Sequence, residues 1–332
     1  MTLHRRHAEA LDRADALAGF RERFVLNDPQ RIYADGNSLG RLPHETVERI
    51  EALVREWGDR LVGGWEHWIE LPVRIGDEIG DVIGARPGET LACDSTTVNL
   101  YKLASAALDL PGEQRAILVD EHDFPTDRYV LEGIAARLGL ELRRMTTDPI
   151  EGPTADDVSR AASAHDVGLV SLSHVSYRTG ALADLPAITE AAQDAGAMVL
   201  WDLSHSAGVL PVRISDSGAD LAVGCTYKYL NAGPGAPAFL FVRSDLQERM
   251  RSPVWGWFGQ RDQFRMGARY EPAAGIERFL AGTPPILGLV AVQAGIELVL
   301  AAGLERLGER RLRSRSSSSP CTTSVSGRSA SA

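Results

Sequence analysis

Lysine is scarce in this chain of 332 residues, and only Lys102 and Lys228 are present. Any chemistry that attaches a ligand to a lysine amine therefore has two candidate positions. Cysteine is scarce too, and Cys93, Cys225 and Cys321 show neither disulfide nor metal-ligand spacing. We therefore expect no metal site and a reducing, cytoplasmic location.

Long apolar runs and a secretory signal pattern are also absent from the sequence, whose first ten residues are largely polar. Acidic residues outnumber basic ones by 45 to 35, which gives a formal net charge of −10. This balance argues against nucleic acid or an anionic membrane as the main partner. With 44% hydrophobic and 24% charged residues, the composition is that of an ordinary globular enzyme.

Strand signals alternate with helix signals, which predicts an α/β fold with a mostly parallel, helix-covered sheet. Short apolar runs predict strands at 116–120, 169–172, 197–201 and 221–224. Apolar residues at helical spacing predict helices over 8–26, 44–57, 94–108, 127–138, 186–195 and 286–311. The strand predicted at 236–242 follows its predecessor too closely for a helical crossover, so we expect it to be antiparallel. The tryptophan-rich stretch 63–72 is predicted to be a loop whose aromatic side chains pack against the protein.

Two charged residues follow neighbouring apolar runs in the stretch 201–234. Asp202 ends one run, and Lys228, flanked by Tyr227 and Tyr229, follows the next. In an open α/β sheet, ligands bind outside the carboxyl ends of the strands, so both groups would face one crevice. A lysine and a carboxylate there suit pyridoxal phosphate: the amine binds the aldehyde covalently, and the carboxylate keeps the pyridine nitrogen protonated. The alternative is a structural ion pair at the sheet edge.

Four motifs carry a resemblance to a known family: W-D-L-S-H-S-A-G (201–208), T-Y-K-Y-L-N-A-G-P-G (226–235), G-W-F-G (256–259) and G-T-P-P (282–285). Together they resemble the kynureninases, fold-type I pyridoxal-phosphate enzymes related to class V aminotransferases and cysteine desulfurases. Cysteine desulfurases place a histidine before the lysine, where this chain has a tyrosine. The resemblance implies a PLP-dependent transferase large domain with a mostly parallel sheet of the seven-stranded type.

The resemblance also implies the cofactor contacts. The phosphate would bind the helix start at Thr96 and Thr97, although helix capping alone explains hydroxyl residues there. Phe124 would stack on the cofactor ring and Asp127 would make a polar contact, the alternatives being a core phenylalanine and a helix N-cap. Ser173 matches a further cofactor contact.

His205 would orient Asp202 or the ring oxygen of the cofactor, and Tyr227 would lie next to the phosphate and relay a proton. The resemblance places Trp257 and Thr283 at the phosphate of a neighbouring subunit, which implies a homodimer. Asp35-Gly36-Asn37 is a turn signal by itself, but the resemblance makes 32–43 a loop over the active site, with Asn37 as a candidate substrate contact.

The implied reaction is hydrolysis of L-kynurenine to anthranilate and L-alanine in tryptophan catabolism, with 3-hydroxykynurenine as a second candidate substrate. The alternatives are another class V enzyme, namely a cysteine desulfurase or an aminotransferase, and an inactive truncated remnant. A C-terminal small domain, with the arginine that pairs with the substrate α-carboxylate, is expected to be missing, so we expect little activity. The expected division is an N-terminal helical segment with the active-site loop (1–60), a PLP-binding domain (61–285), an interdomain helix (286–311) and a disordered Ser/Arg-rich tail (312–332). An RS-type binding segment is the alternative for that tail.

Overall fold

The computed structural model describes residues 5–28, 30–112 and 114–310. Their centre is a seven-stranded sheet with the strand order β1-β7-β6-β5-β4-β2-β3. The strands are β1 (Thr90–Ala92), β2 (Ala116–Asp120), β3 (Glu141–Met145), β4 (Val167–Ser173), β5 (Met198–Asp202), β6 (Leu221–Gly224) and β7 (Phe239–Val242). β7 runs antiparallel to β1 and β6, its neighbours on either side, and every other pair of neighbouring strands is parallel. The predicted α/β fold and the antiparallel strand are therefore confirmed.

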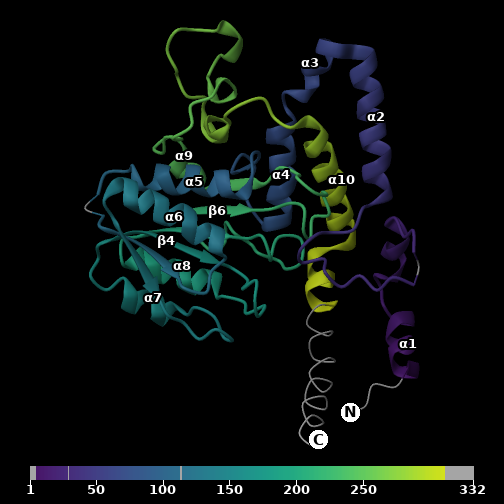
Figure 1. The fold of residues 1–332 in the computed structure, drawn as a ribbon, viewed down its shortest axis with the longest axis horizontal. Helices are drawn as coiled ribbons and strands as arrows, with labels where there is room; N and C mark the ends of the chain where they lie inside the picture. Colours follow the sequence, from purple (N-terminus) through teal and green to yellow (C-terminus); the bar gives the residue numbers. More distant parts are fainter. Residues whose placement is uncertain (1–4, 29, 113, 311–332) are drawn as a thin grey trace, which may run out of the picture.

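Helices cover both faces of this sheet, and Figure 1 shows it between α5 and α6 on one side and α7 and α8 on the other. Beside the sheet, α2, α4 and α10 lie together (Figure 1). Arg49 of α2 forms a bidentate ion pair with Glu297 of α10. The α-helices are α1 (Arg5–Arg13), α2 (His44–Arg60), α3 (Trp65–Trp68), α4 (Leu71–Ile83), α5 (Thr96–Leu108), α6 (Pro125–Leu138), α7 (Ala155–Ala161), α8 (Leu185–Asp194), α9 (Ser244–Gln247) and α10 (Ile286–Ala302).

The central strands are apolar throughout because each of their faces meets a helical layer. In β5, Val199 and Trp201 belong to the core cluster formed with α4, α7, α8 and α10. Leu200 between them belongs to the cluster on the other face, formed with α5 and α6. Alternate residues of a strand point to opposite faces, so a continuous apolar run is the pattern expected of a strand covered on both sides.

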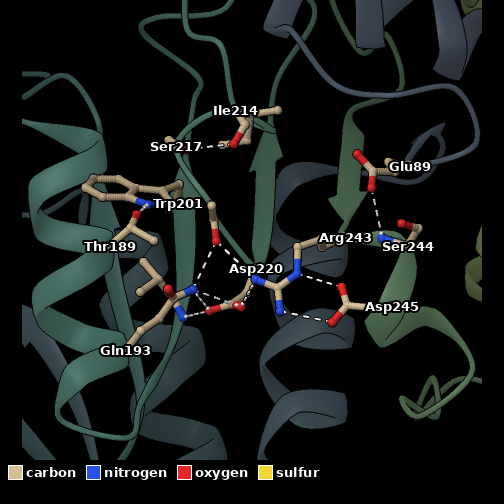
Figure 2. A network of polar contacts seen from close by, with 12 residues as sticks. Glu89, Thr189, Gln193, Trp201, Ile214, Ser217, Asp220, Arg243, Ser244 and Asp245 are labelled. Carbon is tan, nitrogen blue, oxygen red and sulfur yellow. Dashed lines mark hydrogen bonds and ion pairs between the residues drawn. The ribbon is translucent and has the colours of Figure 1, made fainter.

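A polar network holds the amino-terminal ends of β5 and β6 (Figure 2). Asp220, just before β6, accepts hydrogen bonds from the backbone N–H of Val199 at 2.9 Å and from Arg243 Nη1 at 2.8 Å. The side chain of Gln193 at the end of α8 donates to the same carboxylate. Burial raises the pKa of Asp220, but the arginine and the amides compensate its charge. The buried polar groups at the amino-terminal ends of the strands therefore have their partners within the protein. The opposite edge of the sheet, formed by the carboxyl ends of the strands, is the one where a ligand would bind.

Three expectations about helices were wrong. The segment 8–26 does not form one helix, because α1 ends at Arg13 and a separate 3-10 helix covers Ala18–Arg23. The stretch 63–72 is helical rather than a loop: a 3-10 helix at Leu61–Gly64 and α3 lead into α4, and Trp68 is buried.

The third error concerns 286–311, which was predicted as one helix. α10 ends at Ala302, Gly303 adopts a φ of 83°, and the helical stretch Leu304–Arg310 continues at an angle of 74° to α10. Glycine alone tolerates this left-handed backbone without strain, so it ends the helix. Residue 311 and the tail 312–332 lie outside the described residues. Within the described ranges, no single helix is long and apolar enough to cross a bilayer, and only the bent pair of α10 with Leu304–Arg310 passes by length and composition.

Candidate active site

Asp202 and Lys228 come from adjacent parallel strands, as the sequence predicted. Asp202 is the last residue of β5, where it lies opposite Val223 of β6, and Lys228 follows the end of β6. The carboxylate of Asp202 is buried and its Oδ1 accepts a hydrogen bond from the backbone N–H of Ser204 at 2.8 Å. Lys228 Nζ lies 3.1 Å from Nε2 of His205. The role of His205 in orienting Asp202 stays a prediction, while its contact with the lysine is a feature that the motif did not reveal.

Two further carboxylates are buried beside Asp202. Asp127, in the first turn of α6, shares a hydrogen bond with Asp202, and burial together with the Asp202 charge raises the pKa of Asp127 well above its usual range. Asp123 accepts a hydrogen bond from the backbone N–H of Ser173 at 3.0 Å. Burial raises the pKa of Asp123 to about 7. The carboxylates of Asp123, Asp127 and Asp202 thus crowd a site in which Lys228 supplies a positive charge.

The alternative interpretation of Asp127 as the N-cap of its helix is wrong. Phe124 occupies the N-cap position of α6, and Pro125 is the first helical residue. The side chain of Asp127 is therefore free to turn into the site toward Asp202. The contact of Asp127 with the cofactor, which the resemblance implied, stays a prediction.

Aromatic rings surround the lysine amine. Lys228 Nζ lies 5.8 Å from the ring centroids of both Phe124 and Tyr227. Phe124 is not a core residue, since 39% of it is exposed, and Tyr177 packs edge-on against its ring at a centroid distance of 5.2 Å. Burial raises the pKa of Tyr227 to about 12, so its phenol stays protonated at neutral pH and can donate a proton. Sequence reasoning missed Tyr177, although it lies in the loop that begins directly after β4.

The start of α5 lies at the same edge of the sheet as Lys228. Ala92 at the end of β1 pairs with Phe239 of β7, and Phe239 pairs in turn with Gly224 at the end of β6. Thr96 and Thr97 form the first turn of α5, so their backbone N–H groups and hydroxyls are available at this edge. The Oγ of Ser95 caps only one N–H, that of Val98, at 3.3 Å. Capping and anion binding are therefore compatible here.

Trp257 and Thr283 lie on exposed segments that pack against each other. The backbone N–H of Phe258 donates to the carbonyl of Ala281 at 3.2 Å. A Cβ on Gly256 would lie 1.9 Å from that same carbonyl oxygen, so this close approach requires glycine. We call the segments 256–259 and 279–283 the paired loops. They place Trp257 and Thr283 on adjoining segments at the protein surface.

The loop 32–43 packs directly on the lysine segment. The backbone N–H of Gly40 donates to the carbonyl of Tyr227 at 2.8 Å, and a Cβ on Gly40 would lie 2.2 Å from the carbonyl oxygen of Lys228. Asn37 is exposed in this loop.

A cavity of about 420 Å³ lies between this loop, Lys228 and the end of α10. Its lining is largely apolar, and its charged members among the described residues are Arg41 and Lys228. The Arg41 guanidinium lies 5.0 Å from the centroid of the Tyr33 ring. Sequence reasoning missed Arg41 because nothing in its local pattern links it to the lysine. Among the residues that the structure describes, no cluster of His, Cys, Asp or Glu could hold a metal ion.

Comparisons with known proteins place this geometry in a class and then in a family. The model of the class-V aminotransferase family matches residues 68–317, so the chain is a fold-type I protein of that class. A kynureninase from Pseudomonas fluorescens is 42% identical over 312 residues, which are 91% of this chain and 73% of the relative. A kynureninase from Burkholderia pseudomallei is 40% identical over 316 residues, with 93% of this chain and 74% of the relative covered. The chain belongs to the kynureninase family.

Solved structures share the fold at lower sequence identity. A cysteine desulfurase from Thermococcus onnurineus superimposes with a TM-score of 0.77 at 22% identity, covering 90% of this chain and 75% of its own. The C-DES protein, solved with glycine covalently linked to its PLP cofactor, gives a TM-score of 0.74 at 22% identity, covering 85% of this chain and 74% of its own. At such identities the likeness defines the fold alone.

Proposed function

We propose that this chain binds pyridoxal phosphate and hydrolyses L-kynurenine to anthranilate and L-alanine. The observation that carries the proposal is the buried cluster of Asp123, Asp127 and Asp202 beside Lys228, at the carboxyl edge of the sheet. Crowded carboxylates of this kind call for a further cation, and the protonated pyridine nitrogen of the cofactor is one. The α5 start offers N–H groups for the phosphate. The residues present therefore fit the cofactor.

Each residue has a defined task in this reaction. The bound cofactor supplies an electron sink for the carbanion formed at the substrate Cα. Lys228 would hold the cofactor, and its amine is the base that takes the Cα proton. Asp202, which shares a hydrogen bond with Asp127, would keep the pyridine nitrogen protonated. Phe124 would stack on the cofactor ring and restrict its plane. The protonated phenol of Tyr227 can donate a proton to the reacting substrate as the product forms.

The cavity beside Lys228 suits an aromatic amino acid. Its apolar lining accommodates an aryl ring, and the absence of carboxylates among its described lining residues favours an anion. The family resemblance matches no residue of this chain to the arginine that binds the substrate α-carboxylate, which is why the sequence predicted little activity. Arg41 lines the same cavity as Lys228, and we propose that its guanidinium binds that carboxylate, because a planar fork matches the geometry of a carboxylate.

We further propose that the protein is a cytoplasmic homodimer in which Trp257 and Thr283 of one subunit reach the phosphate of the other. Their exposure on the paired loops supports this arrangement. Sedimentation of the cofactor-loaded protein should show a dimer, and a monomer that binds the cofactor tightly would contradict the shared site.

A cysteine desulfurase activity is not favoured by the cysteines of the described residues. Cys93 and Cys225 are both buried, and burial raises the pKa of the Cys93 thiol to about 12 and also raises that of Cys225. A desulfurase needs an accessible thiolate to receive the sulfur, and neither residue provides one.

The test is to supply the purified protein with pyridoxal phosphate and to follow the fluorescence of anthranilate after adding L-kynurenine, or that of 3-hydroxyanthranilate after adding 3-hydroxykynurenine. L-Cysteine, with detection of sulfide, is the parallel substrate. Anthranilate formation that disappears in Asp202→Asn protein supports the proposal. Sulfide release without anthranilate, or anthranilate formation that persists in the variant, would refute it.

A further inference from the structure

Lys102 is a buried cation on the helix that begins at Thr96. No part of its side chain is exposed. Nζ donates to Asp94 Oδ2 at 2.5 Å and to the backbone carbonyl of Phe279 at 2.6 Å, and it lies 3.6 Å from Cys93 Sγ. Burial alone would lower the pKa of Lys102, but neighbouring Cys93 and Asp94 raise it, so the amine is charged. A buried charge persists only where its partners compensate the lost hydration.

The first partner of Lys102, Asp94, lies just before the start of α5. Asp94 has a φ of 49°, a left-handed conformation that is uncommon for a residue with a side chain. Its carbonyl accepts from the N–H of Ala238 at 2.9 Å, which ties this turn to the sheet. The next residue, Ser95, is the N-cap of α5. The Lys102–Asp94 ion pair therefore stabilises the backbone turn that aims the first N–H groups of α5.

The second partner lies on the paired loops. Phe279 is followed within four residues by Thr283, and the carbonyl of Ala281 between them accepts from the N–H of Phe258, next to Trp257. Lys102 thus connects the phosphate-facing end of α5 to the loops that carry Trp257 and Thr283. No other described lysine or arginine contacts both Asp94 and the Phe279 carbonyl.

We propose that Lys102 is a positioning residue for the cofactor phosphate, a buried cation that fixes the α5 start and the paired loops in one geometry. It does not touch the cofactor, since its amine is enclosed by Asp94, Cys93 and Phe279. Lys102 should affect only the binding of the phosphate group. Its partners lie at the start of α5 and on the paired loops, and not at Asp202 or Lys228. This inference rests on the cofactor binding proposed above and not on the identity of the substrate.

A merely structural role and a positioning role differ in one measurable ratio. Pyridoxal has the aldehyde and the pyridine ring of the cofactor but lacks its phosphate. A general loss of structure would weaken the binding of pyridoxal and of pyridoxal phosphate alike. A displaced phosphate site would weaken the binding of pyridoxal phosphate only, and so would reduce the preference of the protein for the phosphorylated form.

The experiment compares dissociation constants for both compounds in wild type, Lys102→Met and Asp94→Asn, measured from the change in absorbance on binding. Methionine keeps the apolar stem of the side chain, and Asp94→Asn removes the ion pair while leaving the lysine in place. We expect the preference for pyridoxal phosphate to fall about tenfold or more in both variants, the effect of one or two lost charge-assisted hydrogen bonds. If Lys102→Met does not fold, Asp94→Asn decides the question.

Leu103→Ala is the matched control. Leu103 is the neighbouring residue on the same helix and is fully buried, so its truncation loosens α5 without touching the ion pair. This variant should lose stability and keep the preference for the phosphorylated cofactor. Equal weakening of both compounds in the Lys102 and Asp94 variants would overturn the proposal, as would the same loss of preference in Leu103→Ala. A wild type with no preference for pyridoxal phosphate would instead refute the proposed cofactor site, whatever its activity on L-kynurenine.

Discussion

In the cofactor-free protein, Asp123 should make stability fall as pH rises. Burial raises the pKa of Asp123 from 3.8 to about 7. Between these values the folded state binds a proton that the unfolded state has lost, so the free energy of unfolding decreases with increasing pH. The gap between the two pKa values corresponds to at most about 4 kcal/mol, a large part of the stability of a typical domain. The contribution is complete below pH 4 and lost once pH exceeds about 7.

Asp123→Asn isolates this effect, because asparagine keeps the size of the side chain and does not titrate. Urea unfolding of the cofactor-free proteins, followed by tryptophan fluorescence at pH 4.5, 6 and 8, gives the free energy of unfolding for each. We expect the variant to gain stability relative to wild type as pH rises, by up to about 4 kcal/mol. Asp81→Asn, on the exposed side of α4, is the control for the substitution itself. Parallel pH curves for wild type and Asp123→Asn would refute the reasoning.

The cofactor should reduce the same pH dependence. A cation placed beside Asp123, Asp127 and Asp202 favours their charged forms and lowers their pKa values. With saturating pyridoxal phosphate, the difference between wild type and Asp123→Asn should therefore change less between pH 4.5 and 8. An unchanged difference would mean that the carboxylates do not face the charge of the cofactor.

Substitutions at three further positions test the site directly. Borohydride treatment of the cofactor-loaded protein should attach the cofactor to the peptide that contains Lys228. Lys228→Ala protein should retain no reducible cofactor. Attachment to Lys102 would refute the assignment of Lys228. Asp202→Asn should still bind the cofactor but lose at least about a hundredfold in anthranilate formation, because the buried charge partner of the pyridine nitrogen is gone, while Asp202→Glu keeps more. Arg41→Gln should raise KM for L-kynurenine about tenfold with little change in kcat, through loss of a charge-assisted hydrogen bond to the carboxylate; an unchanged KM would remove Arg41 from the substrate site.

The placement of Asp202 and Lys228 could be predicted because it depends on short-range patterns and one topological rule. Each follows an apolar run that is short enough to be a buried strand, and parallel neighbours end at the same edge of a sheet. The prediction for the α5 start likewise needed only a hydroxyl residue before a helical pattern. Of the two lysines that the sequence offered, Lys102 is enclosed by Asp94 and by the carbonyl of Phe279.

The remaining features depend on contacts between distant segments, which periodicity does not encode. The tryptophan-rich stretch 63–72 was predicted to be a loop, but it is helical, and Trp65 and Trp68 pack together edge-on at 5.8 Å. The long apolar pattern of 286–311 hid the break at Gly303. Proximity of Arg41 to the lysine and the clustering of carboxylates arise only when strands and loops assemble in three dimensions.

The two edges of the sheet show why the functional one can be recognised by its charge balance. Both edges carry buried aspartates, which are costly unless their charge is compensated. At the amino edge, Asp220 is matched by Arg243, by Gln193 and by a backbone N–H, so the network is complete within the protein. At the carboxyl edge, burial raises the pKa values of Asp123 and Asp127, and the charges of neighbouring carboxylates raise them further, although Lys228 lies nearby. A protein retains such an imbalance where a ligand supplies the missing charge, and that is the edge where a protonated pyridine ring would bind.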